Sequence, residues 1–239
     1  MRILMISDVY FPRINGVSTS IQTFRHEMEK LGHEITLIAP DYGEIADKEQ
    51  RDTEKNVLRI PSRRVILDPE DRMMSLSAIT ALKDTLARQA FDLIHVHTPF
   101  VAHYAGVKLA KHLDLPLLLT YHTLFEEYLY HYIPFLPKAL LRKATRWFSR
   151  AQCNQADKVI APSSVIVDLL RNYGVEKNIE VIPTGIRCKE FQSGNGEKFR
   201  AEFGLSSDHK VLLNVSRVAF EKKHRLATRI NRPGQTATT

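Results

Sequence analysis

The chain has 239 residues, 44% of them hydrophobic, and its 34 Lys and Arg against 27 Asp and Glu give a formal charge of +7. Such a composition can bury a core, which excludes a disordered chain. Cys153 and Cys188 lie far apart with no ligand cluster nearby, which excludes a disulfide framework or a zinc ribbon and favours a reducing compartment.

Short apolar runs, each followed by a helical pattern, recur along the chain. Strands that are covered on both faces read almost continuously apolar, and their alternation with helices is typical of parallel sheets. We therefore predict an α/β fold with a Rossmann-like, doubly wound, mainly parallel sheet. Its strands are expected at residues 2–7, 34–39, 57–61, 92–97, 115–121, 158–161 and 180–183.

Helix boundaries are marked by local signals. Apolar residues recur at helical spacing over residues 21–31, and Gly32 follows them as a C-terminal cap residue would. Thr98-Pro99 and Pro162-Ser163 each follow a strand directly and predict helix starts with a hydroxyl cap or a first-turn proline.

The rest of the chain is expected to be less regular. Residues 41–72 are polar and are predicted to form a surface excursion with a single short strand. A linker is expected at residues 193–196, followed by a helix over 197–203 and a strand over 211–215. Residues 224–239 lose their apolar periodicity and are predicted to be a disordered tail. Because residues 217–239 hold six basic residues and one acidic residue, most of the positive charge belongs to this end.

Polar residues stand at the carboxyl ends of five expected strands. Ligands bind at this edge of an open parallel sheet because loops and positive helix N-termini meet there. The residues are Asp8 and Asn15-Gly16 after the first strand, His95 and His97 at the end of the fourth, His122 after the fifth, Ser163 after the sixth and Thr184-Gly185 after the seventh. Five such placements predict a binding site.

The loop from Asp8 to Ser18 is a candidate phosphate site. A glycine that opens a helix lets an anion approach the amides of the first turn. The alternative is an ordinary strand-to-helix turn at Gly16. The dinucleotide motif Gly-x-Gly-x-x-Gly occurs nowhere in the chain, which disfavours a nicotinamide or flavin enzyme.

Three histidines are candidates for the site. His95 and His97 lie two apart on a strand and project to the same face. A metal pair is one interpretation, but their element offers no supporting ligand, so we expect buried histidines bonded to backbone carbonyls, with a structural or site-shaping role and no metal. His122 follows a strand directly, and acid–base function and a capping role both remain open for it.

A loop rich in aromatic residues, 125–136, precedes a basic helix. The loop suits a partly wet pocket or a membrane headgroup region, or else a hydrophobic cluster of its own. In the helix, Leu140, Leu141, Ala144, Trp147 and Phe148 form one stripe, which favours either a membrane-surface helix or a solvated helix with its stripe in the core. The basic residues on its other side are Lys138, Arg142, Lys143, Arg146 and Arg150.

Two basic residues, Arg217 and Lys222, leave the last expected strand. An arginine fork and a lysine point charge at such a position would suit a diphosphate. In a loop without other context they would mean little. The arginines that follow have no stacking aromatics or reading motif, so no nucleic-acid partner is expected.

Taken together, these motifs resemble the glycosyltransferase family 4 group of GT-B enzymes, especially bacterial glycolipid glucosyl- and mannosyltransferases. The resemblance runs from Met1 to about Lys223. It rests on the order of six motifs: Asp8-x-Tyr10-x-Pro12-x-x-Asn15-Gly16-Val17, Asp92-Leu93-Ile94-His95-Val96-His97-Thr98, Thr120-Tyr121-His122-Thr123, Ala156-Asp157-x-Val159-Ile160-x-Pro162-Ser163, Val181-Ile182-Pro183-Thr184-Gly185-Ile186 and Arg217-x-Ala219-x-Glu221-Lys222.

The resemblance implies a retaining transferase that moves a hexose from a nucleotide-sugar, such as UDP-glucose or GDP-mannose, to a lipid or glycan hydroxyl without an obligatory metal or other cofactor. By carry-over, Asn15, Gly16, Arg217 and Lys222 would bind the donor phosphates, and His122 would contact the donor sugar as the catalytic residue. The acceptor site would be lined by Asp8, Tyr10, His97, Tyr128 and Tyr132. An anionic membrane would meet Lys138, Arg142, Lys143, Arg146, Trp147 and Arg150, which implies a cytoplasmic protein on the inner face of the plasma membrane.

The resemblance also implies a domain organisation. Residues 1–192 correspond to the acceptor-binding domain, 193–223 to a linker and the start of the donor-binding domain, and 224–239 to the tail. Ser216 stands where the family has glycine and Lys223 where it has asparagine, and the family's paired-glutamate motif does not occur. We therefore expect a truncated, acceptor-domain-only form, and the sequence leaves open whether a separate polypeptide supplies the donor domain. The alternatives are a non-catalytic lipid- or partner-binding module and a sugar-nucleotide epimerase-like protein.

Overall fold

The computed structural model describes residues 1–43, 55–65, 71–122, 137–186, 188 and 192–211. The chain divides into two units, Met1–Ile186 and Arg187–Thr239. In the described part of the second unit, helix α9 spans Gly196–Glu202, and the Asn195 side chain accepts a hydrogen bond from the Lys198 amide at its start. The site lies in the first unit.

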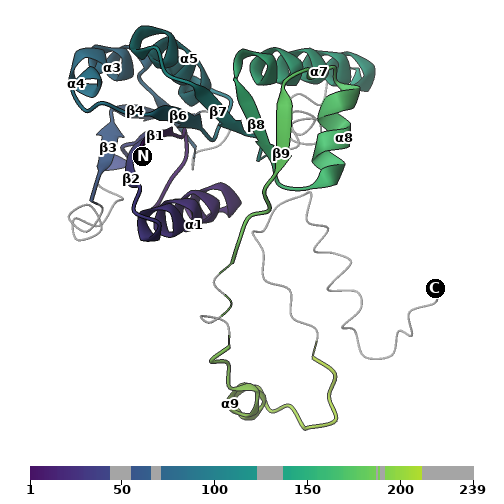
Figure 1. Cartoon of the computed structure of the whole chain (residues 1–239). Coiled ribbons are helices and arrows are strands. Elements are labelled where there is room, and N and C mark those ends of the chain that lie inside the picture. The colour runs from purple at the N-terminus through teal and green to yellow at the C-terminus, as the bar shows by residue number, and fades with distance from the viewer. Residues whose placement is uncertain (44–54, 66–70, 123–136, 187, 189–191, 212–239) are drawn as a thin grey trace. The chain divides into compact units, whose positions relative to one another are not determined.

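Seven strands of the described chain form one sheet in the order β3-β2-β1-β6-β7-β8-β9, with every neighbouring pair parallel (Figure 1). This confirms the predicted doubly wound architecture. Most boundaries agree with the sequence to within two residues. The strands are β1 (Arg2–Ile6), β2 (Glu34–Pro40), β3 (Val57–Ile60), β6 (Leu93–Val96), β7 (Leu117–Thr120), β8 (Lys158–Ala161) and β9 (Asn178–Val181).

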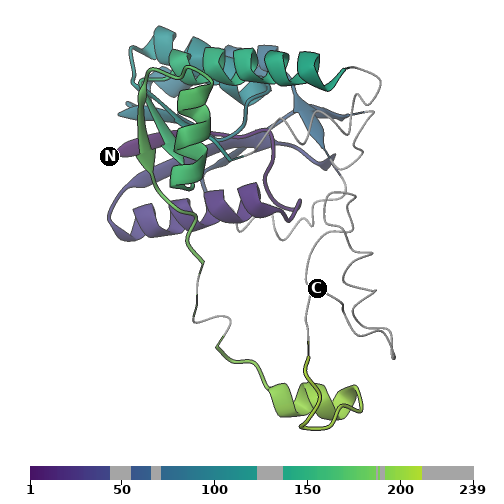
Figure 2. The same cartoon turned by 90° about the vertical axis from the view of Figure 1, so that its right-hand side faces the viewer.

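Helices cover both faces of the sheet. Figures 1 and 2 show α1 on one face and α3, α4, α5 and α7 on the other. Successive residues of a strand face opposite ways, so Met5 packs toward α1 while Leu4 and Ile6 enter the larger core on the other face. The helices of this unit are α1 (Gly16–Lys30), α3 (Leu76–Ala81), α4 (Lys83–Ala87), α5 (Val101–Leu113), α7 (Lys138–Gln155) and α8 (Ser164–Asn172).

Two glycines bear on how the helices meet the sheet. Gly32 adopts a left-handed φ of +83° just after α1, which confirms the predicted cap. Gly106 lies in α5, where a Cβ atom would overlap the Val96 side chain of β6. The absence of a side chain at residue 106 therefore lets α5 lie close against the strand that leads to His97.

The segment between β2 and β6 differs from the prediction of a single strand. Besides β3, an antiparallel pair is present, formed by β4 (Ser62–Arg64) and β5 (Arg72–Met74). Its three arginines hide the apolar signal of such short strands, although Met74 packs into the larger core and Arg72 is buried.

The start of α5 also differs from the prediction. The helix begins at Val101 after Phe100, which makes no side-chain cap bond, so neither Thr98 nor Pro99 opens it. A carboxylate from another strand, Asp8, takes the capping role instead. In α8, Ser163 does stand at the N-cap, but its hydroxyl makes no cap hydrogen bond.

Candidate functional site

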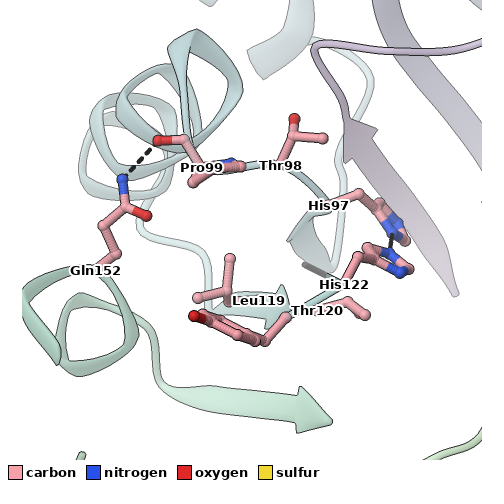
Figure 3. Close-up of a pocket in the computed structure, with 8 residues that line it drawn as sticks. His97, Thr98, Pro99, Leu119, Thr120, His122 and Gln152 are labelled. Carbon is pink, nitrogen blue, oxygen red and sulfur yellow. Dashed lines mark hydrogen bonds between the residues drawn. The ribbon is translucent and has the colours of Figure 1, made fainter. Parts of the chain in front are cut away.

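The carboxyl edge of the sheet gathers polar side chains from several strands. His95 and His97 come from β6 and its end, Thr120 and His122 from β7 and the residues after it. His95 Nε2 lies 2.7 Å from Thr120 Oγ1, and His97 Nδ1 lies 3.1 Å from His122 Nε2 (Figure 3). The predicted common face of His95 and His97 is confirmed by their rings, whose centroids are 4.0 Å apart. The predicted bonds to backbone carbonyls are wrong, because both rings bond to side chains of the next strand.

The three histidine rings form a row, in which His95 is tilted against His97 and His97 is stacked on His122. The His97 and His122 rings are 5.4 Å apart with an interplanar angle of 24°. Phe24 of α1 flanks the row at 6.4 Å from His95 and 6.5 Å from His97, between ring centroids. Helix α1 therefore closes the row on the side away from α5.

Burial keeps these histidines uncharged at neutral pH. It lowers the pKa of His95 to about 3 and that of His122 to about 4, and it lowers the pKa of His97 well below the ordinary value. A neutral imidazole carries one N–H and one lone pair, so each ring is able to donate one hydrogen bond and to accept another. At neutral pH the row offers hydrogen bonds and no charge.

Asp8 joins two strands and a helix beneath this edge. Its carboxylate accepts hydrogen bonds from the Thr98 hydroxyl at 2.8 Å and from the Ala102 amide at 3.1 Å, and its own amide donates to Thr98 Oγ1 at 2.7 Å. Burial raises the pKa of Asp8 to about 6, although these hydrogen bonds favour the anion. Asp8 therefore fixes the start of α5 and the residue next to His97.

The N-terminus of α1 is open at its first residue. Asn15 caps the helix, with Oδ1 accepting from the Ser18 amide at 2.8 Å. A Cβ atom at Gly16 would meet nothing within 4 Å. Neither packing nor a positive φ therefore demands glycine at position 16. The first turn of a helix leaves amides without an intrahelical partner, and Gly16 at this position is exposed.

The loop after β9 reaches α1. Thr184 Oγ1 lies 3.3 Å from Ser20 Oγ, and a Cβ at Gly185 would lie 3.6 Å from the Thr23 side chain. The residues predicted after the seventh strand therefore lie against the middle of α1, at Ser20 and Thr23. Ser163 lies at the start of α8, apart from these contacts.

Hollows lie at both edges of the sheet. At the carboxyl edge a cavity of about 20 Å³, room for one water molecule, has His97 and His122 in its wall (Figure 3). Its other lining residues are Thr98, Pro99, Leu119, Thr120, Tyr121 and Gln152. A larger hollow of about 210 Å³ lies where the strands begin, lined by Arg2, Glu34, Thr36, Asn56, Gln89 and Phe91. The smaller one carries the candidate site, because its wall includes His97, His122 and the residues just before α5.

The sequence was compared with models of known families. The model of Glycosyltransferase Family 4 matches residues 14–190, which is most of the chain. This chain belongs to Glycosyltransferase Family 4. The predicted resemblance is thereby confirmed, and the matched residues include Asn15, His97 and His122.

Curated relatives support the same family. The chain is 33% identical over 230 residues to an alpha-monoglucosyldiacylglycerol synthase of Streptococcus pneumoniae, covering 93% of this chain and 50% of the relative. It is 26% identical over 226 residues to a GDP-mannose-dependent alpha-mannosyltransferase of Corynebacterium glutamicum, covering 93% of this chain and 52% of the relative. The chain thus spans about half the length of these relatives.

A solved structure agrees with the fold. Sucrose-phosphate synthase of Thermosynechococcus elongatus superposes with a TM-score of 0.62 at 19% identity, over 87% of this chain and 53% of that one. The predicted fold class, a Rossmann-like half of a GT-B architecture, is confirmed.

The predicted site residues of this family member do not all lie at the candidate site. Asn15, Gly16, His97 and His122 lie at the carboxyl edge, and Asp8 supports them from below. Tyr10 instead lies in the core beneath α1, where its hydroxyl accepts a hydrogen bond from Arg25 at 3.1 Å. Tyr128, Tyr132, Arg217, Lys222 and the strand predicted over residues 211–215, beyond its first residue, lie outside the described residues.

Helix α7 is turned differently from the prediction. Trp147 and Leu140 of the predicted apolar stripe are 72% and 54% exposed, and Ala144 is exposed as well. The buried face is partly polar instead. It carries Leu141, Thr145, Ser149, Gln152 and Cys153. Exposed basic residues share the outer face with Trp147: Arg142, Lys143, Arg146 and Arg150.

Polar residues on the buried face of α7 hydrogen-bond to residues that line the small cavity. Ser149 Oγ lies 2.9 Å from the Tyr121 hydroxyl, and Gln152 Nε2 donates to the Pro99 carbonyl at 2.5 Å. The sequence analysis missed Gln152 and Thr120 as parts of the site. A polar residue at a core position of an amphipathic helix is the signal that points to Gln152.

Among the described residues, no group of three or more His, Cys, Asp or Glu side chains could hold a metal ion. No helix in this part of the chain has both the length and the apolar character needed to cross a membrane.

Proposed function

We propose that this chain forms the acceptor-binding half of a retaining glycosyltransferase, which moves a hexose from a nucleotide-sugar to the hydroxyl of a diacylglycerol-like lipid or another acceptor. Family membership and the names of the relatives support the reaction class. The observation that carries the proposal is the position of an uncharged, half-buried His122 on the same edge as the open N-terminus of α1. The donor half would be supplied by residues beyond about 192 or by a second polypeptide.

On the donor side, the first amides of α1 would meet the phosphates of UDP-glucose or GDP-mannose. Asn15 already occupies the Ser18 amide, which leaves the amides of Gly16 and Val17 for an anion. By the family resemblance, Arg217 and Lys222 would stabilise the departing diphosphate. Such preorganised donors act most strongly on charge that develops during the reaction.

His122 would hold the hexose while the bond changes take place. The acceptor oxygen forms a bond to the anomeric carbon, the bond to the nucleoside diphosphate breaks, and the hydroxyl proton leaves with the diphosphate. An imidazole with a pKa of about 4 stays neutral through this step. Its contribution is orientation of the sugar.

On the acceptor side, we propose that α7 lies on an anionic membrane at the cytoplasmic face, with Tyr128 and Tyr132 nearer the lipid. The helix contains five basic residues and no Asp or Glu. Trp147 is exposed among them, and an aromatic ring with surrounding cations suits the headgroup region. Arg150 also contacts Glu176 at 3.4 Å, so Lys143 and Arg142 are better probes of this face.

A chimera tests the transferase proposal. Residues 1–192 are joined to the donor half of the Streptococcus pneumoniae relative and supplied with UDP-glucose and diacylglycerol vesicles. Glucolipid formation is expected, with a loss of at least about 100-fold in His122→Ala because a contact to the reacting sugar is gone. A folded chimera that makes no glycolipid from either UDP-glucose or GDP-mannose would contradict the proposal. The 239-residue chain alone is expected to bind neither donor tightly in calorimetry.

The exposed face of α7 supports one alternative, a non-catalytic module that binds lipid surfaces. Co-sedimentation with vesicles of anionic and of neutral lipid addresses membrane binding separately from catalysis. Lys143→Glu is expected to weaken binding to anionic vesicles by about tenfold, since each basic residue near the surface contributes about 1 kcal/mol. Lys83→Glu makes the same charge change on α4 and is the matched control. Binding by a chain whose chimera is inactive would favour the module.

A further inference from the structure

Each of the two fully buried histidines at the site has one ring nitrogen without a partner. His95 bonds through Nε2 and His97 through Nδ1, while His95 Nδ1 and His97 Nε2 have no hydrogen-bond partner among the described residues. His97 is 1% exposed. The ring nitrogen that carries the single proton of His97 therefore determines whether Nε2 is a buried N–H donor or a buried lone pair without a partner.

Two proton arrangements fit the contact between His97 Nδ1 and His122 Nε2. In one, His122 donates, and His97 must then carry its proton on Nε2 as a buried N–H with no acceptor in the described part of the chain. In the other, His97 donates from Nδ1, and its Nε2 is left as a bare lone pair. Orphaned buried N–H groups are rarer in folded proteins than under-used acceptors, and leaving one unbonded costs about 1–3 kcal/mol. The second arrangement is therefore favoured.

We propose that His97 is a positioning residue that donates from Nδ1 to His122 Nε2 and so fixes His122 as the tautomer with its proton on Nδ1. His122 then presents an N–H donor to the ligand. This inference rests on the proposed function for the identity of that ligand. It narrows the partner of His122 to an oxygen that accepts a hydrogen bond, such as a hydroxyl or ring oxygen of the transferred sugar, and it excludes His122 as the base that deprotonates the acceptor.

The surroundings make His97 the fixed member of the pair. Its amide donates to the Ile6 carbonyl at 3.0 Å, the His95 ring stacks against it, and the next residue, Thr98, is bonded to Asp8. His122 is half-buried and follows the last residues of β7 (Figure 3). Burial lowers the pKa of both rings, so both are neutral at pH 7.

Long-range proton–nitrogen NMR of the ¹⁵N-labelled chain at pH 7 reads the tautomers without any donor or acceptor. The expected spectrum has His122 and His97 both protonated at Nδ1 and unprotonated at Nε2. A wild-type spectrum with the His122 proton on Nε2 would overturn the inference. Because this measurement needs no catalysis, failure of the transferase proposal and failure of the tautomer proposal are distinguishable.

Variants separate positioning from simple packing. His97→Phe keeps a ring and removes the donor, so the fixed His122 tautomer is expected to be lost. His97→Asn places an amide N–H near the position of Nδ1 and is expected to retain it. His103→Phe removes another buried histidine, bonded to Gln155 at 3.0 Å, and is expected to leave the His122 signals unchanged. If His97→Phe leaves the tautomer intact, His97 does not set it.

The chimera adds a kinetic measurement. There, His97→Phe is expected to lower kcat by about 10–100-fold, as the loss of a residue that orients a ligand-binding histidine does in metal sites. His97→Asn is expected to recover most of that loss. Equal losses in the two variants would overturn a role through hydrogen-bond donation.

Discussion

The two ends of the sheet hold their polar residues in different ways. At the amino end, Arg2 contacts Glu34 at 2.8 Å while both side chains stay at least half exposed, and Asp92 accepts from the Arg2 amide at 2.6 Å. At the carboxyl end, Asp8 and the histidines are buried and bond to one another across elements. Exposed pairs contribute little to stability, whereas buried polar groups must be satisfied. Burial of polar groups therefore costs more free energy of folding at the carboxyl end than at the amino end. Such unfavourable burial of polar groups is typical of functional sites.

Acid should reveal the largest difference between the two ends. Burial lowers the histidine pKa values below the unfolded value of about 6.5, so the unfolded chain binds more protons, and stability falls as the pH drops below 6.5. Asp8 acts in the opposite direction, because its folded pKa of about 6 exceeds its unfolded value. Three histidines against one carboxyl predict a loss of about 3 kcal/mol per pH unit near pH 5.

Urea unfolding at several pH values measures this slope. His95→Gln keeps a group able to bond Thr120 and removes one titration, so its slope should be shallower by about 1.4 kcal/mol per pH unit. Identical slopes for His95→Gln and the wild type would show that the buried histidines do not drive acid unfolding.

Two aspartates offer a matched pair across the sheet. Asp8→Ala leaves the Thr98 hydroxyl and the Ala102 amide without their acceptor, and we expect it to lower the free energy of unfolding by about 3 kcal/mol. Asp92→Ala, at the amino end, should cost less than about 1 kcal/mol because its surroundings are exposed to water. Chemical denaturation at pH 7 compares them, and equal costs would remove the contrast between the ends.

Substitutions at two glycines test how closely α5 and α1 pack against their neighbours. Gly106→Ala forces a methyl group into Val96, and we expect a loss of about 2 kcal/mol in thermal or urea unfolding. Gly16→Ala adds the same methyl group in open space and should change stability by no more than about 0.5 kcal/mol. A large effect at Gly16 would mean that its glycine serves the fold.

The smallest effect is expected for the ion pair at the amino end. Arg2→Ala and Glu34→Ala should show a coupling of less than about 1 kcal/mol in a double-mutant cycle, decreasing further as salt is added. A coupling of several kcal/mol that resists salt would make the amino end as demanding as the carboxyl end.

Much of the fold was predictable because each strand carries its own signal. Apolar runs and the cap at Gly32 placed β1, β2 and β8 within a residue or two. The β4 and β5 ribbon was not predicted because three arginines interrupt its short strands, although Met74 is buried in the core. The apolar stripe of α7 did not predict which face of the helix is buried. Ser149 and Gln152 are buried and hydrogen-bond to loop residues, whereas Trp147 is exposed.

The sequence by itself determined the family, the doubly wound sheet and the edge at which the polar residues lie. Periodicity and motif order encode these features locally. Only the tertiary structure decided that Asp8 caps a helix 94 residues away and that His97 meets His122 across 25 residues. Such bonds depend on strand register and on how closely helices approach, and both result from packing of the whole domain. A buried histidine acquires its partner, and with it its proton, only when the strands are in place.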